Sequence, residues 1–128
     1  RLAVGLASTP STLVHGNWKF GNLGSDGDGR TVLIDWENPG RGAGCAELAW
    51  YLAINSARLP CSREVTIDAY RDGLERRGID TAPWWERQLA LGLLAGMVWL
   101  GWEKAFGGYD DELAWWADRA TEGARYLR

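Results

Sequence analysis

Histidine and cysteine are scarce in this sequence, and their scarcity excludes the commonest metal sites. The chain has one histidine, His15, and two cysteines, Cys45 and Cys61, in 128 residues. The cysteines lack metal-ligand spacing, and a single histidine cannot complete a His/Cys cluster for zinc. We therefore expect two reduced cysteines in a cytoplasmic protein.

An excess of positive charge is also absent. Fourteen Lys and Arg residues stand against seventeen Asp and Glu residues, for a formal net charge of −3. No basic patch is therefore available for a phosphate backbone, and no nucleic acid is expected as a partner. A mildly acidic surface would suit a cationic small molecule, but a charge this small is equally what solubility requires.

The sequence has no apolar run long enough to span a bilayer. The longest, at residues 89–102, has fourteen residues, whereas a spanning helix needs about 20. The first residues also lack the long apolar core of a signal peptide. We expect a buried core helix at residues 89–102 and no membrane as a partner.

One domain over residues 1–128 is expected, because 46% hydrophobic residues suffice for a single core and the length is too short for two. The chain begins with Arg rather than Met, and its first residues read as the middle of an element. This start indicates a fragment or a processed chain.

The first third of the chain predicts a loop beside a β-hairpin. A short β-branched run at residues 12–15 delivers His15 into a loop, and residues 30–36 form the clearest strand. The segment Asp-Gly-Asp-Gly at 26–29 is a strong hairpin signal, since Asp and Gly tolerate positive φ. We therefore expect His15 and Asp35, at the end of that strand, to be neighbours.

Four helices are predicted after the hairpin. The first covers residues 45–57, and the second follows a Ser62 cap and ends at Gly78. The third begins at residues 81–83 and ends near residue 106, and the fourth covers 110–127 with an acidic first turn. The predicted fold class is α+β and predominantly helical, with the loop and hairpin at 12–36 and the helical part at 45–128.

Tryptophan is abundant, with nine in the chain. The last two predicted helices carry six of them, at positions 84, 85, 99, 102, 115 and 116. The simplest interpretation is a core built from large aromatic side chains with their indole N–H groups near the surface. An aromatic wall for a ligand is the alternative.

Polar residues in the loop and at the strand end suit phosphoryl transfer. That reaction needs metal ions that bridge the phosphates, oxygen ligands that hold the metals, and a residue that receives the hydroxyl proton. Asn22 follows Asn17 by five residues, and Asp35 ends the neighbouring strand. Amide and carboxylate oxygens are the hard ligands that Mg²⁺ prefers.

The motifs "HGNWKFGN" and "VLIDWENPGRGAGCAELAWYL" resemble the aminoglycoside phosphotransferase family, the small-molecule relatives of protein kinases. Its loop reads His-Gly-Asp, four residues, then Asn, and its next hairpin ends in Ile-Asp-Trp or Ile-Asp-Phe. The similarity continues to "WEKAF" and "ELAWWADRA" and covers most of the chain. It is greatest to bacterial members with Trp-Lys after His-Gly-Asp.

The resemblance implies the C-terminal lobe of a protein-kinase-like fold, with ATP and Mg²⁺ bound between two lobes and a small-molecule hydroxyl as acceptor. By motif position, Asn22 and Asp35 would be metal ligands, His15 and Glu47 would support the loop, and Asn17 would occupy the catalytic-base position. Nothing before His15 provides a Gly-rich loop or a Lys-bearing strand. The N-terminal lobe is therefore expected to be absent from this chain.

Two positions depart from the family pattern. Asn17 replaces the Asp base, and an amide cannot accept a proton at neutral pH, although it can hydrogen-bond a hydroxyl. A positioned base is worth roughly 10²–10⁴ in rate, so its loss costs about 3–5 kcal/mol of transition-state stabilisation. Glu47 stands where the family usually has Asp before Leu-Ala, so the geometry of its contact with the loop is open.

Each of these residues alone has an ordinary structural role: histidine as an internal hydrogen-bonding group, and Asn or Asp as turn residues. Their combination with the hairpin and "ELAWYL" favours the phosphotransferase motif over these separate structural roles. Three hypotheses follow: an ATP-dependent phosphotransferase weakened by Asn17, an inert pseudo-kinase module that binds nucleotide or ligand, and an interaction fragment. The third would pair through the exposed lobe face, by self-association or with an N-terminal lobe.

Overall fold

Helices make up most of the structure, and the strands are confined to residues 12–42. The computed structural model describes the backbone of all 128 residues and every side chain except that of Ala57. The helices are α1 (Leu2–Ala7), α2 (Gly44–Asn55), α3 (Arg63–Glu75), α4 (Trp85–Phe106) and α5 (Asp110–Ala124). The strands are β1 (Thr12–Val14), β2 (Leu23–Ser25), β3 (Thr31–Leu33) and β4 (Gly40–Gly42). The prediction of a predominantly helical α+β chain is confirmed.

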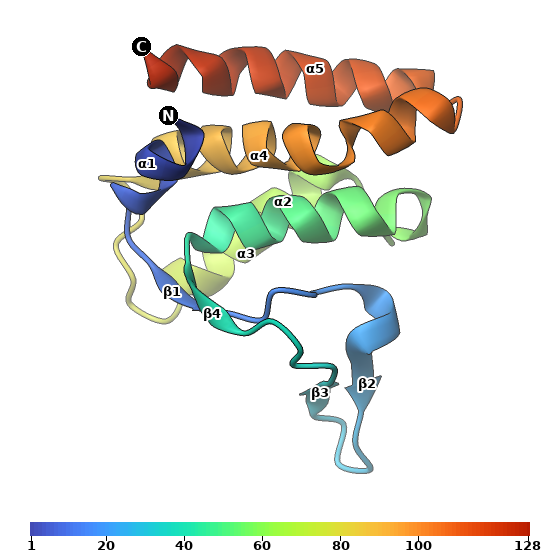
Figure 1. Cartoon of the computed structure of the whole chain (residues 1–128). Helices are drawn as coiled ribbons and strands as arrows, with labels where there is room; N and C mark the ends of the chain where they lie inside the picture. The colour runs from blue at the N-terminus through green and yellow to red at the C-terminus, as the bar shows by residue number, and fades with distance from the viewer.

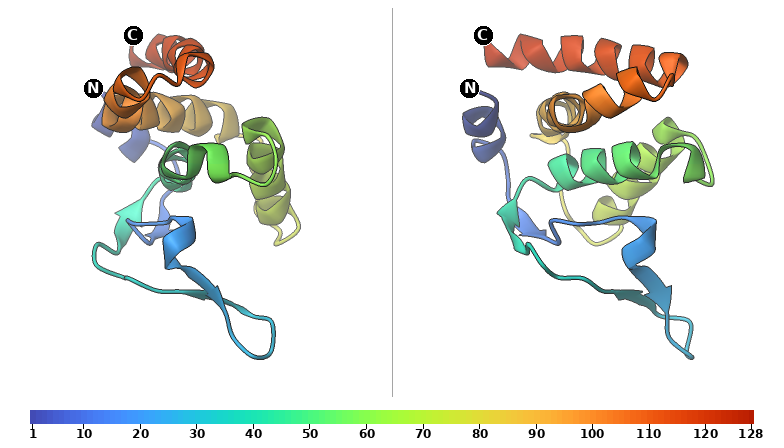
Figure 2. Two further views of the ribbon diagram at one scale, coloured as in Figure 1. Left: turned by 90° about the vertical axis from the view of Figure 1, so that its right-hand side faces the viewer. Right: turned by 45° about the vertical axis from the view of Figure 1, so that its right-hand side comes forward.

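The helices stack with α4 in the middle. It lies between α2 and α5, its two principal packing partners, and the loop and hairpin project from the opposite side of α2 (Figure 1). Strands β1 and β4 form one antiparallel pair, with Leu13 opposite Arg41, and β2 and β3 form another, with Gly24 opposite Val32. The β2–β3 hairpin extends away from the helices in both other views (Figure 2).

The core forms where α2, α4 and α5 meet. Leu48 and Leu52 of α2 are fully buried, and Trp116 of α5 is 1% exposed among them. The helices approach closely at Gly92 of α4, where an added Cβ would lie 2.5 Å from the Cys45 carbonyl oxygen. Burial of each large apolar side chain contributes about 1.5–3 kcal/mol. This core therefore holds α2 in place, and the loop packs against the opposite side of α2.

A buried ion pair closes the other end of α2. The Lys104 ammonium donates to the Ala53 carbonyl oxygen at 2.8 Å and lies 3.5 Å from the Glu112 carboxylate. Glu112 also accepts hydrogen bonds from the Trp116 indole and the Ser56 hydroxyl. Lys104 therefore satisfies a carbonyl at the end of α2 that has no partner within the helix.

Most helix boundaries agree with the sequence predictions. The Ser62 hydroxyl caps α3 by accepting from the Val65 amide, as expected. Gly78 has φ +78°, and the amides of Gly78 and Ile79 donate to Glu75 and Leu74 in a Schellman-type closure. Helix α2 ends at Asn55, two residues before its predicted end, because Ser56 takes φ +37°.

Three features differ from the predictions or were not predicted. Helix α4 begins at Trp85 rather than at 81–83, because Trp84 leaves helical geometry at φ −136° while its indole donates to the Asp80 carbonyl. Helix α5 ends at Ala124 and continues as a 3₁₀ turn, Arg125–Leu127. Helix α1 and strand β4 have no sequence prediction.

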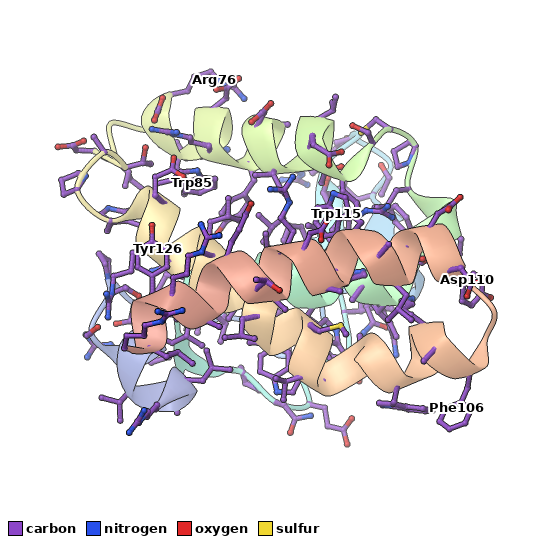
Figure 3. All side chains as sticks on the ribbon, turned by 90° about the horizontal axis from the view of Figure 1, so that it is seen from above. Arg76, Trp85, Phe106, Asp110, Trp115 and Tyr126 are labelled. Atoms are coloured by element: carbon purple, nitrogen blue, oxygen red, sulfur yellow. The ribbon has the colours of Figure 1, made fainter. Side chains whose placement is uncertain are left out.

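The interpretation of the tryptophans as core residues holds for some of them and not for others. Trp85 and Trp116 are core residues, whereas Trp99 is 45% exposed and Trp102 is 63% exposed. Phe106 also points away from the helices at the end of α4 (Figure 3). The expected core helix at 89–102 is therefore buried on most of its surface and exposed along one stripe.

The length argument made from residues 89–102 is wrong for the whole helix: α4 has 22 residues and is long and apolar enough by length and composition to cross a membrane. The central helix of a helical core passes the same test, and 44% of the relevant window is buried inside this structure. Length and composition alone therefore do not make α4 a membrane span.

The two cysteines are expected to differ in reactivity. Burial raises the pKa of the Cys45 thiol to about 12, while Cys61 is exposed. Because the thiolate is the reactive form, iodoacetamide at pH 8 should modify Cys61 and leave Cys45 unmodified until the chain is unfolded. Mass spectrometry should count one adduct on native protein and two in guanidinium. The Cys61→Ser variant should give none when native, and two adducts on native wild type would contradict the buried thiol.

Candidate active site

The loop after β1 and the residues after β3 meet in space. Hairpin pairing places Leu23 opposite Leu33, and the Ile34 amide donates to the Asn22 carbonyl oxygen at 3.0 Å. This hydrogen bond extends the pairing of β2 and β3 by one residue. It brings Asn22 close to Asp35, which follows Ile34 in the chain. The predicted neighbourhood of His15 and the strand end is also present, since the His15 ring lies 2.9 Å from the carbonyl oxygen of Ile34, the residue before Asp35.

One oxygen of Asp35 accepts hydrogen bonds from two of the predicted site residues. Its Oδ2 atom accepts the Asn17 side-chain amide at 2.7 Å and the Asn22 side-chain amide at 3.1 Å. The same Asn22 amide nitrogen donates to the Asn17 carbonyl oxygen at 2.8 Å. Asn22 is buried, whereas Asp35 is exposed, so the cluster has a buried side and an open side.

Asp35 holds this position through an unusual backbone conformation. Its φ of +64° lies in the left-handed region, which Asp and Asn enter more readily than other non-glycine residues. Such a conformation costs on the order of 1–3 kcal/mol and is kept only where surrounding contacts enforce it. The two hydrogen bonds that the side-chain amides of Asn17 and Asn22 donate to Oδ2 are such contacts.

His15 ties the loop to the strand end. Its Nδ1 atom accepts the Asn17 backbone amide at 3.2 Å, so the ring proton is on Nε2, which donates to the Ile34 carbonyl oxygen at 2.9 Å. The ring is 3% exposed and meets Trp36 edge to face at 4.5 Å between centroids. Both ring nitrogens are occupied by the backbone, which is the geometry of a supporting residue.

Glu47 contacts the same loop from α2. Its Oε1 atom accepts the Gly16 amide at 2.7 Å, so this longer side chain reaches the loop backbone. Glu47 also lies in the first turn of α2, where the helix dipole favours a carboxylate. Gly16 has φ +79°, and a Cβ there would lie 2.1 Å from the Asn38 carbonyl oxygen, so only glycine fits.

Two contacts that sequence reasoning missed hold the far side of the loop. The Phe20 amide donates to the side chain of Asn55 at 2.9 Å, and Asn55 is buried at the end of α2. Trp18 stacks on Tyr51 at 4.4 Å between ring centroids. The available signal was an Asn in the last turn of an otherwise apolar helix, where a buried amide needs a partner.

Asp35 and Asn22 could hold a cation only if a bound molecule, such as a phosphate group, supplied further oxygen ligands. Among the side chains that the structure describes, no group of three His, Cys, Asp or Glu residues could hold a metal ion. Asp35 offers a carboxylate, but Asn22 turns its NH₂ group toward it and would have to present its carbonyl oxygen instead. This set suits Mg²⁺, which is commonly held by one or two carboxylates plus substrate phosphates and water.

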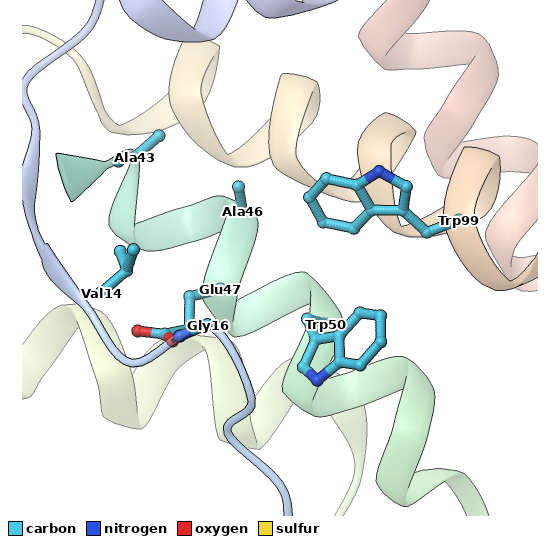
Figure 4. Close-up of a pocket in the computed structure, with 8 residues that line it drawn as sticks. Val14, Gly16, Ala43, Ala46, Glu47, Trp50 and Trp99 are labelled. Atoms are coloured by element: carbon cyan, nitrogen blue, oxygen red, sulfur yellow. Dashed lines mark hydrogen bonds between the residues drawn. The ribbon is translucent and has the colours of Figure 1, made fainter. Parts of the chain in front are cut away.

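A cavity of about 370 Å³ lies beside Gly16, which is one of its lining residues. The side chains around it come from β1, from α2 and the residue before it, and from the exposed side of α4 (Figure 4). They are Val14, Ala43, Ala46, Glu47, Trp50 and Trp99. Glu47 therefore links the cavity to the loop that carries Asn17.

Comparison with known proteins gives no relative on which to base a role. No protein-family model, curated protein or solved structure matches the chain. The assignment of function therefore relies on the geometry and chemistry of the site.

A methyl group at position 16 should disturb the whole loop. Gly16→Ala combines a disfavoured positive φ with overlap on the Asn38 carbonyl, and we expect a loss of about 1–3 kcal/mol in unfolding free energy. Urea denaturation followed by circular dichroism measures it. Gly27→Ala, at the hairpin tip where an added Cβ meets nothing within 4 Å, is the control. Equal stability of the two variants would contradict the close approach.

Proposed function

We propose that this chain is part of an ATP-dependent phosphotransferase that acts on a hydroxyl group of a small molecule. The observation that carries the proposal is the convergence of Asn17 and Asn22 on one carboxylate oxygen of Asp35. Asp35 reaches this point in a backbone conformation that needs support. Functional sites are where such conformations are concentrated.

The proposal includes the fold that the motifs imply. The helical stack and the loop would form part of the C-terminal lobe of a protein-kinase-like fold. ATP would then bind on the open side of the Asp35 cluster, with an N-terminal lobe supplying the rest of the nucleotide site.

In the proposed reaction, the alcohol oxygen forms a bond to the γ-phosphorus of ATP while the bond from that phosphorus to the ADP oxygen breaks. The products are a phosphate monoester and ADP, and the hydroxyl proton is released to water. When bound, Mg²⁺ would offset the charge of the phosphate oxygens. Asp35 and Asn22 would hold that ion, and the Asn17 amide would orient the hydroxyl group.

The reaction would be slow because Asn17 cannot take the proton. Positioning and electrostatics supply most of the rate enhancement in phosphoryl transfer, so loss of the base weakens the site without removing the other contributions. His15 does not replace the base, since both of its ring nitrogens are engaged with the backbone.

A second candidate function is an inert module that binds nucleotide without turnover. The hydrogen bond from the Asn17 side chain to Asp35 favours this second function. Asn17 is the residue that would orient the hydroxyl and Asp35 the carboxylate that would hold the metal, and in this structure the two bind each other. The two candidates share nucleotide binding and differ in phosphate transfer.

Nucleotide binding should depend on Asp35. Calorimetric titration with Mg·ATP is expected to show binding to the wild-type chain and a loss of roughly tenfold or more in affinity in Asp35→Ala, since the carboxylate is the anionic metal ligand. Asp118→Ala, an exposed carboxylate on α5, should bind like wild type. Equal affinity in all three proteins would exclude the assigned role of Asp35.

Restoring the acid at position 17 should couple loop stability to Mg²⁺. Asn17→Asp replaces a 2.7 Å hydrogen bond with two facing carboxylates, so the melting temperature should fall in EDTA and recover with Mg²⁺. Asn38→Asp, at an exposed position whose described side chain makes no bond to Asp35, is the control. A melting temperature for Asn17→Asp that does not respond to Mg²⁺ would argue against a cation at Asp35.

The same variant separates the two candidate functions. With an N-terminal lobe present, a phosphotransferase should gain about tenfold or more in ADP formation with an alcohol acceptor, because a positioned base is worth at least that much. An inert binding module should show no acceptor-dependent ADP formation either before or after the substitution.

A further inference from the structure

The cavity beside Gly16 owes its space to small residues at the start of α2. Ala43 and Ala46 line one side, and Trp50 and Trp99 stand on the other (Figure 4). The two indole rings meet at 67°, with 6.3 Å between their centroids. A volume of about 370 Å³ is within the range of small-molecule sites.

The two tryptophans turn carbon rather than nitrogen toward each other. Figure 4 shows the two indole nitrogens on the outer edges of their rings, away from the gap between Trp50 and Trp99. The Trp50 indole nitrogen is buried and has no hydrogen-bond partner among the described residues. An indole that leaves its N–H unpaired and directs its apolar surface to a cavity provides shape and apolar contact for a ligand.

Charge around the cavity is limited to one carboxylate. Among the side chains that the structure describes, Glu47 is the single charged one lining it, and one of its oxygens already accepts the Gly16 amide. A ligand with several ammonium groups would therefore leave most of them without an anionic partner in an apolar site. The cavity disfavours the polycationic amino sugars that the family resemblance suggests.

Acidic residues elsewhere do not supply the missing charge. A smaller cleft between α3, α4 and α5 is lined by four carboxylates. Trp115, Arg71 and Arg119 contact three of them, Glu64, Glu86 and Glu122 respectively. The fourth, Asp68, is exposed, and one further carboxylate does not balance several ammonium groups. The buried Glu112 is likewise paired with Lys104.

We infer that the cavity binds a small alcohol with an apolar, ring-bearing body. The ring would lie against Trp50 and Trp99, and the hydroxyl would lie at the Gly16 end, where Glu47 has a second carboxylate oxygen to accept it. Through its bond to the Gly16 amide, Glu47 connects this end of the cavity to the loop that carries Asn17. The role of this alcohol as the phosphoryl acceptor rests on the proposed function; the binding site itself does not.

The test is a titration of the whole chain with naphthaleneethanol, followed through the indole N–H signals in a proton–nitrogen correlation spectrum. The Trp50→Phe and Trp99→Phe variants assign the two signals. We expect saturable shifts of both, and a loss of about tenfold in affinity in Ala46→Leu, which fills the cavity with three added carbon atoms. Ala69→Leu, an exposed position on α3, should bind like wild type.

Three results would overturn the inference: no shift of either signal, unchanged affinity in Ala46→Leu, or tighter binding of deoxystreptamine at the same signals. If Ala46→Leu fails to fold, Trp99→Ala takes its place, and unchanged affinity in that variant would equally overturn the inference. Naphthaleneethanol needs neither ATP nor Mg²⁺, so Asp35→Ala should bind it normally. Probe binding together with no acceptor-dependent ADP formation by Asn17→Asp in the presence of an N-terminal lobe would refute the phosphotransferase alone, and ADP formation without probe binding would refute the cavity alone.

Discussion

The hydrogen bonds to a single oxygen of Asp35 are the constraint on which the site depends. Two side-chain amides share that oxygen, and one of them also bonds the Asn17 carbonyl, so the loop, the hairpin and the strand end are fixed by one small network. The carboxylate keeps its negative charge partly compensated by amide dipoles rather than by a cationic side chain. The open side of the cluster can therefore still attract a cation without first breaking an ion pair.

The helical stack determines where that network sits. Glu47, Tyr51 and Asn55 lie at four-residue spacing on α2, so they share one face, and each contacts the loop. Behind this face, α2 is anchored by Leu48 and Leu52 and by its close approach to α4. The buried Lys104 satisfies the end of the same helix. Rigidity is thus passed from the core to an otherwise irregular loop.

The sequence predicts local features well and long-range ones poorly. Capping chemistry identified Ser62 and Gly78, and the Asp-Gly repeat located the hairpin that makes Asn22 and Asp35 neighbours. Strand β4 has the sequence Gly-Arg-Gly, whose residues do not favour strands, and exists only because β1 pairs with it. The cavity depends on how Trp50 and Trp99, from different helices, come together, and no local pattern contains that information.

The left-handed backbone at Asp35 has an evolutionary consequence. Of the non-glycine residues, Asn and Asp tolerate a φ of +64° best, and the two have nearly the same shape. Their codons differ by a single nucleotide, which is also true at position 17. The charge at either position can therefore change by one point mutation, and at position 35 the new residue would still be one that tolerates the left-handed conformation.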